Sequence, residues 1–208
     1  MSTSPIRLML VDDHPIFLDG MVRMVNSHQD FDIVATALSA ASAIAQFSTF
    51  QPDVTLMDIG LADMDGIEAL LAIRASAPRA RVLILTTFFG DLLVRRAMQA
   101  GAAGYLLKSS LRQDIADAIR LVHAGGCCVP PDIAASLNAN PGPTLSQREV
   151  DVLKLVALGF SNKHIALRLF IKEDTAKVHV KNIMEKLAAA NRTHAVTLAL
   201  KRGILASE

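Results

Sequence analysis

Short apolar runs alternate with amphipathic stretches over the first part of the chain. Five apolar runs predict β-strands, and they cover residues 6–11, 31–37, 53–57, 81–86 and 103–107. Apolar positions recur at helical spacing near 15–27, 39–48, 65–76, 90–100 and 111–124, which predicts a helix after each strand. Five strand–helix units need a parallel sheet with helices on both faces, and right-handed crossovers leave few topologies. The pattern therefore predicts a doubly wound α/β domain.

The pattern changes after residue 124. Residues 124–143 are rich in glycine and proline, which predicts a linker with one short helical turn near 131–138. From residue 144 the spacing predicts helices only, near 146–158, 162–169, 173–188 and 192–201. Ser146 and Glu149 have the spacing of a capping box at the first of them. We expect an α/β domain over 1–124, a linker over 125–143 and a small all-α four-helix domain over 144–208.

Composition narrows the class of protein. The 208 residues are 51% hydrophobic with a net charge of +1, which favours folded domains over disorder. No apolar run approaches the roughly 18–20 residues that span a bilayer, and the first residues lack a signal-peptide pattern. The only cysteines, Cys127 and Cys128, are neighbours and cannot join distant segments, which indicates a reducing compartment. We expect a cytoplasmic protein without membrane association.

Charge is divided unevenly along the chain. Residues 1–125 carry 10 Lys and Arg against 13 Asp and Glu, whereas residues 126–208 carry 11 against 7. Seven lysines lie in the second part and only Lys108 in the first. A basic second part indicates that it faces a polyanion, although ordinary surface variation can produce a difference of this size.

Polar side chains follow several predicted strands where each strand ends. They are Asp12 and Asp13 after the first strand, Asp58 after the third, Thr86 at the end of the fourth and Lys108 after the fifth. Ligands of open α/β sheets bind outside the carboxyl ends of the strands. In a 2-1-3-4-5 strand order the first and third strands are neighbours, about 5 Å apart, so three carboxylates converge. Such a cluster needs a cation or raised pKa values, and an all-oxygen site suits Mg²⁺.

A carboxylate beside Mg²⁺ can also act as a nucleophile and accept a phosphoryl group. The metal and Lys108 would neutralise the phosphoryl oxygens, and the Thr86 hydroxyl would hydrogen-bond to them. Taken singly, an Asp after a strand is usually a turn former or helix cap, and only the joint placement of Asp12, Asp58 and Lys108 at three strand ends favours a site. We interpret His14 as an early helix residue rather than a metal ligand.

The strings LMLVDDHPIFLDG, LMDIGLADMDG, LILTTF and GAAGYLLK resemble the receiver domain of bacterial response regulators over about residues 5–124. The resemblance implies a flavodoxin-like five-stranded fold with Asp58 as the phosphoacceptor. It also implies that Asp13, Asp58 and the backbone carbonyl of Gly60 hold Mg²⁺ directly, and that Asp12 holds it through water.

The same resemblance assigns a switch. It implies that Thr86 is the switch hydroxyl, that Lys108 contacts the phosphoryl group and that the Tyr105 ring turns inward on activation. The sequence departs from the family at Ala62 and Ser109, where such domains usually have proline. These departures affect the geometry of the two loops and the lifetime of the phosphoryl group rather than the chemistry.

The predicted helix over 173–188 is basic. It carries Lys177, His179, Lys181 and Lys186, and its apolar residues able to face a core are Val178, Ile183, Met184 and Leu187. A basic helix behind a tight turn suits the major groove of DNA, where lysines contact phosphates or guanine edges. On charge alone, a solvated lysine face on an ordinary helix explains the pattern as well.

The string LSQREVDVLKLVALGFSNKHIALRLFIKEDTAKVHVKNIMEKL resembles the LuxR-type helix-turn-helix, and the match covers most of 144–200. It implies a recognition helix near 173–187 whose groove-facing residues are Lys177, Val178 and Lys181, with weaker backbone-contact candidates at Arg168, Lys172 and Asn191. Lys172 replaces the usual serine cap and Ala176 a usual valine. Losing the cap costs about 1 kcal/mol, which a stronger phosphate contact offsets. The last helix, 192–201, either completes the core or forms a dimer seam.

Together the two parts resemble a response regulator of the NarL/FixJ type. The resemblance implies a transcription factor, not an enzyme, that a partner histidine kinase phosphorylates and that binds double-stranded DNA as a homodimer. One alternative is a phosphorylation-independent DNA-binding regulator whose receiver only dimerises. A metal-dependent phosphotransferase would need a general base, and the sequence offers no Ser-His-Asp or His-rich constellation. A signalling adaptor whose basic domain binds protein is the third alternative.

Overall fold

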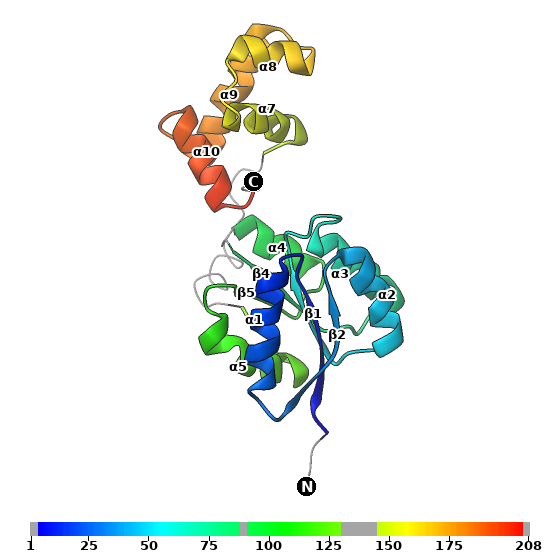
Figure 1. The fold of residues 1–208 in the computed structure, drawn as a ribbon. Coiled ribbons are helices and arrows are strands. Elements are labelled where there is room, and N and C mark those ends of the chain that lie inside the picture. The colour runs from blue at the N-terminus through cyan, green and yellow to red at the C-terminus, as the bar shows by residue number, and fades with distance from the viewer. Residues whose placement is uncertain (1–3, 88–90, 130–144, 206–208) are drawn as a thin grey trace. The chain divides into compact units, whose positions relative to one another are not determined.

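The structure, a computed structural model, describes residues 4–87, 91–129 and 145–205. The chain divides into two compact units, one built around a β-sheet and the other from helices alone (Figure 1). The helical turn expected near 131–138 lies outside the described residues, and so does most of the expected linker. No helix in the described part of the chain is both long and apolar enough to cross a membrane.

The sheet of the first unit has five parallel strands. They are β1 (Ile6–Val11), β2 (Phe31–Ala37), β3 (Val54–Asp58), β4 (Val82–Thr86) and β5 (Gly104–Leu107). Their order is β2-β1-β3-β4-β5, so the predicted doubly wound fold is confirmed. The central strands β3 and β4 are buried along their whole length, as expected for a parallel sheet that helices cover on both faces.

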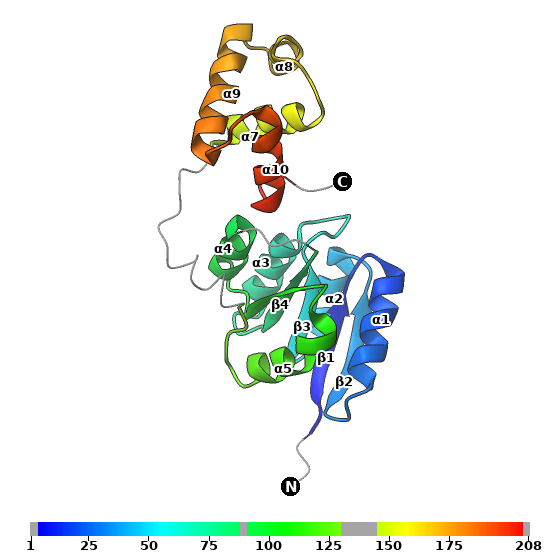
Figure 2. The ribbon, with the colours of Figure 1, turned by 90° about the vertical axis from the view of Figure 1, so that its left-hand side faces the viewer.

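Five helices flank this sheet, and Figure 2 shows them around its strands. They are α1 (Pro15–Asn26), α2 (Ala40–Phe50), α3 (Gly66–Ser76), α4 (Asp91–Gln99) and α5 (Leu111–His123). One apolar cluster joins Leu8 and Leu10 of β1 to Met21 of α1 and Ile119 of α5, so these two helices share a face of the sheet. The alternate residue Met9 is equally buried and points to the other face, where right-handed crossovers place α2, α3 and α4.

The segment after α5 returns to the sheet. Cys128 forms an isolated parallel bridge with Gly104, and its carbonyl accepts a hydrogen bond of 2.7 Å from the Tyr105 amide. A Cβ atom on Gly104 would lie 2.6 Å from the Cys128 carbonyl oxygen, so glycine permits this close approach. The backbone around Cys128 therefore extends the edge of the sheet beside β5.

The second unit consists of α7 (Gln147–Ala157), α8 (Asn162–Leu169), α9 (Glu173–Leu187) and α10 (Arg192–Lys201). The predicted capping box is confirmed, because the Ser146 hydroxyl accepts from the Glu149 amide and the Glu149 carboxylate accepts from the Ser146 amide at 2.7 Å. The core of the unit draws on all four helices, and its fully buried members include Val152, Ile165, Ile183 and Ala199.

The structure corrects one expectation about α9. Val178 does not face the core, because its side chain is 55% exposed. Ala176 instead occupies the buried position in this part of the helix, and the predicted core residues Ile183 and Leu187 are buried. In α10 the inner face completes the core through Ala195 and Ala199.

Candidate functional site

The carboxyl ends of the parallel strands carry the polar residues that the sequence singles out. Asp12 directly follows β1, Asp58 is the last residue of β3, Thr86 is the last residue of β4 and Lys108 directly follows β5. Asp12, Asp58 and Thr86 are buried, at 0%, 4% and 2% exposure. Buried polar side chains grouped at the ligand-binding edge of a parallel sheet make this the candidate site of the first unit.

Lys108 joins two of the carboxylates. Its Nζ lies 2.6 Å from Asp12 Oδ2 and 3.0 Å from Asp58 Oδ2, and its side chain is only 9% exposed. The same nitrogen lies 4.5 Å from the centroid of the Phe17 ring. The lysine stem therefore crosses from β5 past β4 to the end of β3, and it brings a positive charge to the acidic cluster.

Burial dominates the electrostatics of Asp58. Desolvation raises the pKa of this carboxyl above its usual range, although the hydrogen bond and charge of Lys108 lower it in part. The nearby Asp12 carboxylate raises the pKa further, and a hydrogen bond from the Gly60 amide lowers it. The ionised Asp58 carboxylate is therefore costly in this environment, and a cation or a covalent partner that neutralises it is favoured.

His14 lies in the same cluster as the three carboxylates. The sequence analysis interpreted His14 as an early helix residue rather than a metal ligand, so it did not predict this position. Its Nδ1 is 2.7 Å from Asp13 Oδ1 and 3.4 Å from Asp12 Oδ1. His14 occupies the N-cap position of α1 and makes no side-chain capping hydrogen bond. The string Asp-Asp-His-Pro could have indicated that His14 lies near the carboxylates. Proline favours the first position of a helix and restricts the backbone of the residue before it, so His14 directly precedes the helix and follows the two aspartates.

The donor set fits a divalent cation. Ligand atoms of Asp12, Asp13, His14 and Asp58 all lie within 4.8 Å of one another. Three carboxylates with a single lysine carry a formal charge of −2 when His14 is neutral, which a dication balances. Carboxylate oxygens are ligands that Mg²⁺ prefers. Gly60, the predicted carbonyl ligand, is placed beside Asp58 by its amide hydrogen bond.

Tyr105 and Thr86 lie together inside the first unit. Tyr105 is fully buried in β5, and desolvation raises the pKa of its phenol, while a hydrogen bond with Thr86 lowers it. The adjacent strands β4 and β5 are in register here, with Ile84 opposite Tyr105 and Thr86 opposite Leu107. The two predicted switch residues are therefore directly coupled.

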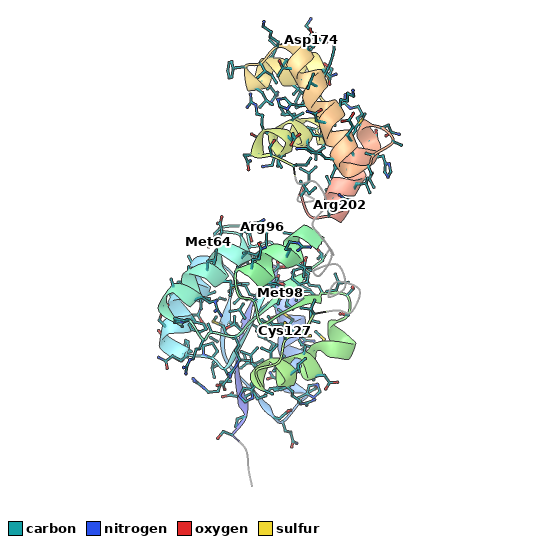
Figure 3. All side chains as sticks on the ribbon, turned by 180° about the vertical axis from the view of Figure 1, so that it is seen from behind. Met64, Arg96, Met98, Cys127, Asp174 and Arg202 are labelled. Atoms are coloured by element: carbon teal, nitrogen blue, oxygen red, sulfur yellow. The ribbon has the colours of Figure 1, made fainter. Side chains whose placement is uncertain are left out.

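The second unit carries its candidate surface on α9. Lys177, Val178 and Lys181 are all exposed, as a groove-facing set requires. Lys177 Nζ lies 3.1 Å from Asp174 Oδ1 and 3.4 Å from Glu173 Oε1, and Lys181 Nζ lies 3.7 Å from Glu185 Oε1. Asp174 lies at one end of this unit (Figure 3). The lysines of this helix face are thus held by neighbouring carboxylates.

The three weaker candidates on the helical unit have different surroundings. Arg168 is exposed and stacks over the Phe160 ring, 4.2 Å from its centroid. Lys172 is exposed at the N-cap of α9 and makes no side-chain capping bond, in line with the missing serine. Asn191 caps α10, where its Oδ1 accepts from the His194 amide at 2.8 Å. Asn191 therefore has a structural role whether or not it contacts another molecule.

Comparison with known proteins identifies a family for each of the two units. Residues 8–120 match the family model of the response regulator receiver domain, and residues 143–199 match that of bacterial regulatory proteins of the luxR family. The chain belongs to the response regulators that carry a LuxR-type helix-turn-helix for DNA binding and transcription regulation.

Several relatives align with this chain along nearly their whole length. The transcriptional regulatory protein LnrK of Bacillus subtilis (strain 168) is 33% identical over an alignment of 216 positions, which spans 96% of this chain and 98% of LnrK. The response regulator protein VraR of Staphylococcus aureus (strain Mu3) is 35% identical over 206 residues, covering 96% and 99%. The crystal structure of ChrA, a response regulator in a heme-sensing two-component system, is 35% identical with a TM-score of 0.57, covering 98% and 100%.

Proposed function

We propose that this chain is a phosphorylation-switched transcription factor and that a partner histidine kinase transfers a phosphoryl group to Asp58. The observation that carries the proposal is the buried Asp58 carboxylate, held 3.0 Å from Lys108 in a cluster of three acids. Its raised pKa reflects a charge that burial disfavours. The same chain carries a helix with exposed Lys177 and Lys181. We place the sensing domain at 1–124, the linker at 125–143 and the DNA-binding domain at 144–208.

At the sensing site, each residue has a role that its position supports. Asp58 attacks the phosphorus atom of the donor's phosphohistidine, the P–N bond breaks, and the leaving imidazole nitrogen keeps the bonding electrons. Asp13, Asp58 and the carbonyl of Gly60 would hold Mg²⁺ directly, and Asp12 through water. When bound, Mg²⁺ neutralises charge on the phosphoryl oxygens. Lys108 needs only to exchange Asp58 Oδ2 for a phosphoryl oxygen.

Thr86 and Tyr105 would form the switch. Thr86 is the last residue of β4, the strand next to Asp58, which supports a role for its hydroxyl in bonding a phosphoryl oxygen. A Thr86 hydroxyl that bonds a phosphoryl oxygen as well as Tyr105 would link phosphorylation to the Tyr105 ring and would alter the surface from β4 to α5. The altered surface would bring two copies together in a homodimer on double-stranded DNA.

On DNA, phosphates would replace the carboxylates that hold the lysines of α9. Lys177, Val178 and Lys181 would face the major groove, with Arg168, Lys172 and Asn191 at the backbone. The protein would act in the cytoplasm and would regulate transcription rather than turn over a small-molecule substrate.

The test is an intact-mass measurement after incubation with Mg²⁺ and acetyl phosphate. We expect one added phosphoryl group on the wild-type chain, none on Asp58→Asn and none on the wild type in EDTA. Asp53→Asn is the matched control, because Asp53 precedes β3 and bonds the Arg7 amide away from the cluster. An adduct that persists in Asp58→Asn would contradict the assignment of the phosphoacceptor.

One observation favours the phosphorylation-independent alternative. The Tyr105 ring is already fully buried and bonded to Thr86, which is the inward arrangement expected of the activated form. A receiver fixed in this arrangement would serve only as a dimerisation domain. DNA affinity that is the same for the wild type and Asp58→Ala, with and without acetyl phosphate, would establish this alternative.

A further inference from the structure

The backbone fixes the start of the His14 side chain. The His14 amide donates to Asp12 Oδ1 at 2.9 Å, and the His14 carbonyl accepts from the Leu18 amide at 3.0 Å. Pro15 follows at the first helical position, which restricts His14 to the extended backbone that it adopts, with φ −96° and ψ 103°. The imidazole therefore leaves a backbone position that the cluster itself holds in place.

The imidazole is not used as a helix cap. N-cap side chains usually supply an oxygen to the free amides of the first turn, and histidine is not among the preferred residues. His14 makes no capping bond, and its Nδ1 lies against Asp13 Oδ1 and Asp12 Oδ1. Lys108 contacts the other oxygen of Asp12, so the lysine and the histidine approach the cluster through different oxygens.

The spacing matches that of ligands around one metal ion. Transition-metal ions bind imidazole nitrogen and carboxylate oxygen at about 2.0–2.2 Å, so opposite ligands lie about 4 Å apart. The ligand atoms of Asp12, Asp13, His14 and Asp58 lie within 4.8 Å of one another. The His14 side chain is 72% exposed, so its ring has room to rotate and close the remaining gap.

We infer that His14 is a direct ligand for transition-metal dications such as Co²⁺, Ni²⁺ and Zn²⁺ in this site. Mg²⁺ binds oxygen and retains water, so it gains little from the imidazole, whereas Co²⁺ and Ni²⁺ bind imidazole nitrogen well. The histidine thus widens the metal preference of a site whose carboxylates alone select Mg²⁺. This inference rests on the proposed Mg²⁺ site and adds transition-metal dications to the ions that the site binds.

The test is calorimetric titration of the full-length, untagged chain with Co²⁺ and separately with Mg²⁺. We expect His14→Asn to weaken Co²⁺ binding at least about tenfold, because losing even an outer-shell partner costs about 10–100-fold. Mg²⁺ affinity should stay within about threefold. His28→Asn is the control, because His28 contacts Phe31 and lies outside the cluster. Histidine ¹⁵N NMR with Zn²⁺ should show a shifted ring nitrogen that disappears in His14→Asn.

The outcomes separate this inference from the proposed function. Equal weakening of Co²⁺ and Mg²⁺ binding would show that His14 only positions Asp13 through the contact between their side chains, which overturns direct ligation. If Co²⁺ affinity is unchanged in His14→Asn and the wild type shows no shifted His14 ring nitrogen with Zn²⁺, direct ligation is overturned as well. The proposed function still stands in that case if the wild type binds Mg²⁺ and is phosphorylated on Asp58. His14-dependent Co²⁺ binding without any Mg²⁺ binding would support the inference and contradict the proposed Mg²⁺ site.

Discussion

Lys108 in the first unit and Lys177 in the second each contact two carboxylates, but their burial differs. Lys108 is 9% exposed, and its partners Asp12 and Asp58 are 0% and 6% exposed at the side chain. Lys177 is 54% exposed, and its partners Glu173 and Asp174 are 47% and 92% exposed. Charges in the buried group interact strongly, and removing the lysine leaves two buried carboxylates without their cation. The exposed group is screened by solvent, so it can exchange its acids for DNA phosphates at little cost.

The largest effect on folding is expected at Lys108. Lys108→Met leaves Asp12 and Asp58 buried without their cation, and breaking a buried ion pair in this way costs about 3–5 kcal/mol. Urea unfolding in EDTA, followed through amides of the first unit, measures the loss. Arg96→Met is the control, because Arg96 is 54% exposed beside Asp65 and should change stability little. If the two variants lose the same free energy of unfolding, burial does not determine how much an ion pair contributes to stability.

Lys186 provides an intermediate case in the second unit. Its side chain is 33% exposed, and its Nζ lies 2.7 Å from Glu149 Oε2, which is 5% exposed. Lys186→Met should cost about 1.5–3 kcal/mol, the range for hydrogen bonds to charged groups. Hydrogen exchange at core amides such as that of Ile183 measures it in the full chain. A loss as large as that in Lys108→Met would break the correlation with burial.

The same pair predicts a dependence on pH. Burial raises the pKa of Glu149, but hydrogen bonds from Lys186 and Ser146 outweigh burial and hold the pKa below its usual value. A lowered folded-state pKa stabilises the fold above the unfolded pKa of about 4.3, and this contribution is lost as the pH falls through the folded value. The second unit should therefore lose stability in acid, and Glu149→Gln should reduce that slope. Asp151→Asn, which removes another acid from the same helix, is the matched control variant.

Asp58→Asn is expected to stabilise the first unit, in contrast to Lys108→Met, which is expected to destabilise it. Burial raises the pKa of Asp58, so its ionised form opposes folding at neutral pH, and removing the charge should raise the melting temperature in EDTA. Saturating Mg²⁺ should stabilise the wild type more than the variant and reduce the difference. Scanning calorimetry measures both. A variant less stable than the wild type in EDTA would show that Lys108 outweighs the desolvation of Asp58.

The smallest effect on folding is expected at the exposed group. Lys177→Met should leave the melting temperature of the second unit unchanged within error, because solvent screens both of its ion pairs. Its effect appears on DNA, where the slope of log affinity against log salt should fall by about 1 as one phosphate contact is lost. Asp174→Asn removes a carboxylate that contacts Lys177, so it should strengthen DNA binding. Lys154→Met on α7 is the exposed control and should leave the salt slope unchanged.

The sequence was sufficient for the five strands and, once a 2-1-3-4-5 order is assumed, for the convergence of Asp12, Asp58 and Lys108. Each of these residues sits at the end of a continuous apolar run, and parallel topology then brings the run ends together. The capping box at Ser146 was equally accessible, because its two residues lie three positions apart in the chain.

Contacts that depend on side-chain rotation or on distant segments could not be predicted. The His14 ring could have faced solvent, and only the packing of the loop after β1 places its Nδ1 beside Asp13. The pairing of Glu149 with Lys186 joins residues 37 positions apart and follows from how α7 meets α9. Val178 had the spacing of a core residue, and the smaller Ala176 takes the buried position instead.

The central claim is that phosphorylation of Asp58 controls DNA binding, and it is tested most directly by DNA affinity. A duplex selected from a random pool with the acetyl-phosphate-treated wild type serves as the probe in fluorescence anisotropy at fixed salt. We predict that Mg²⁺ and acetyl phosphate strengthen binding by the wild type at least about tenfold, a coupling of about 1.4 kcal/mol. Asp58→Asn should not respond. Equal affinity of the treated and untreated wild type would contradict the account.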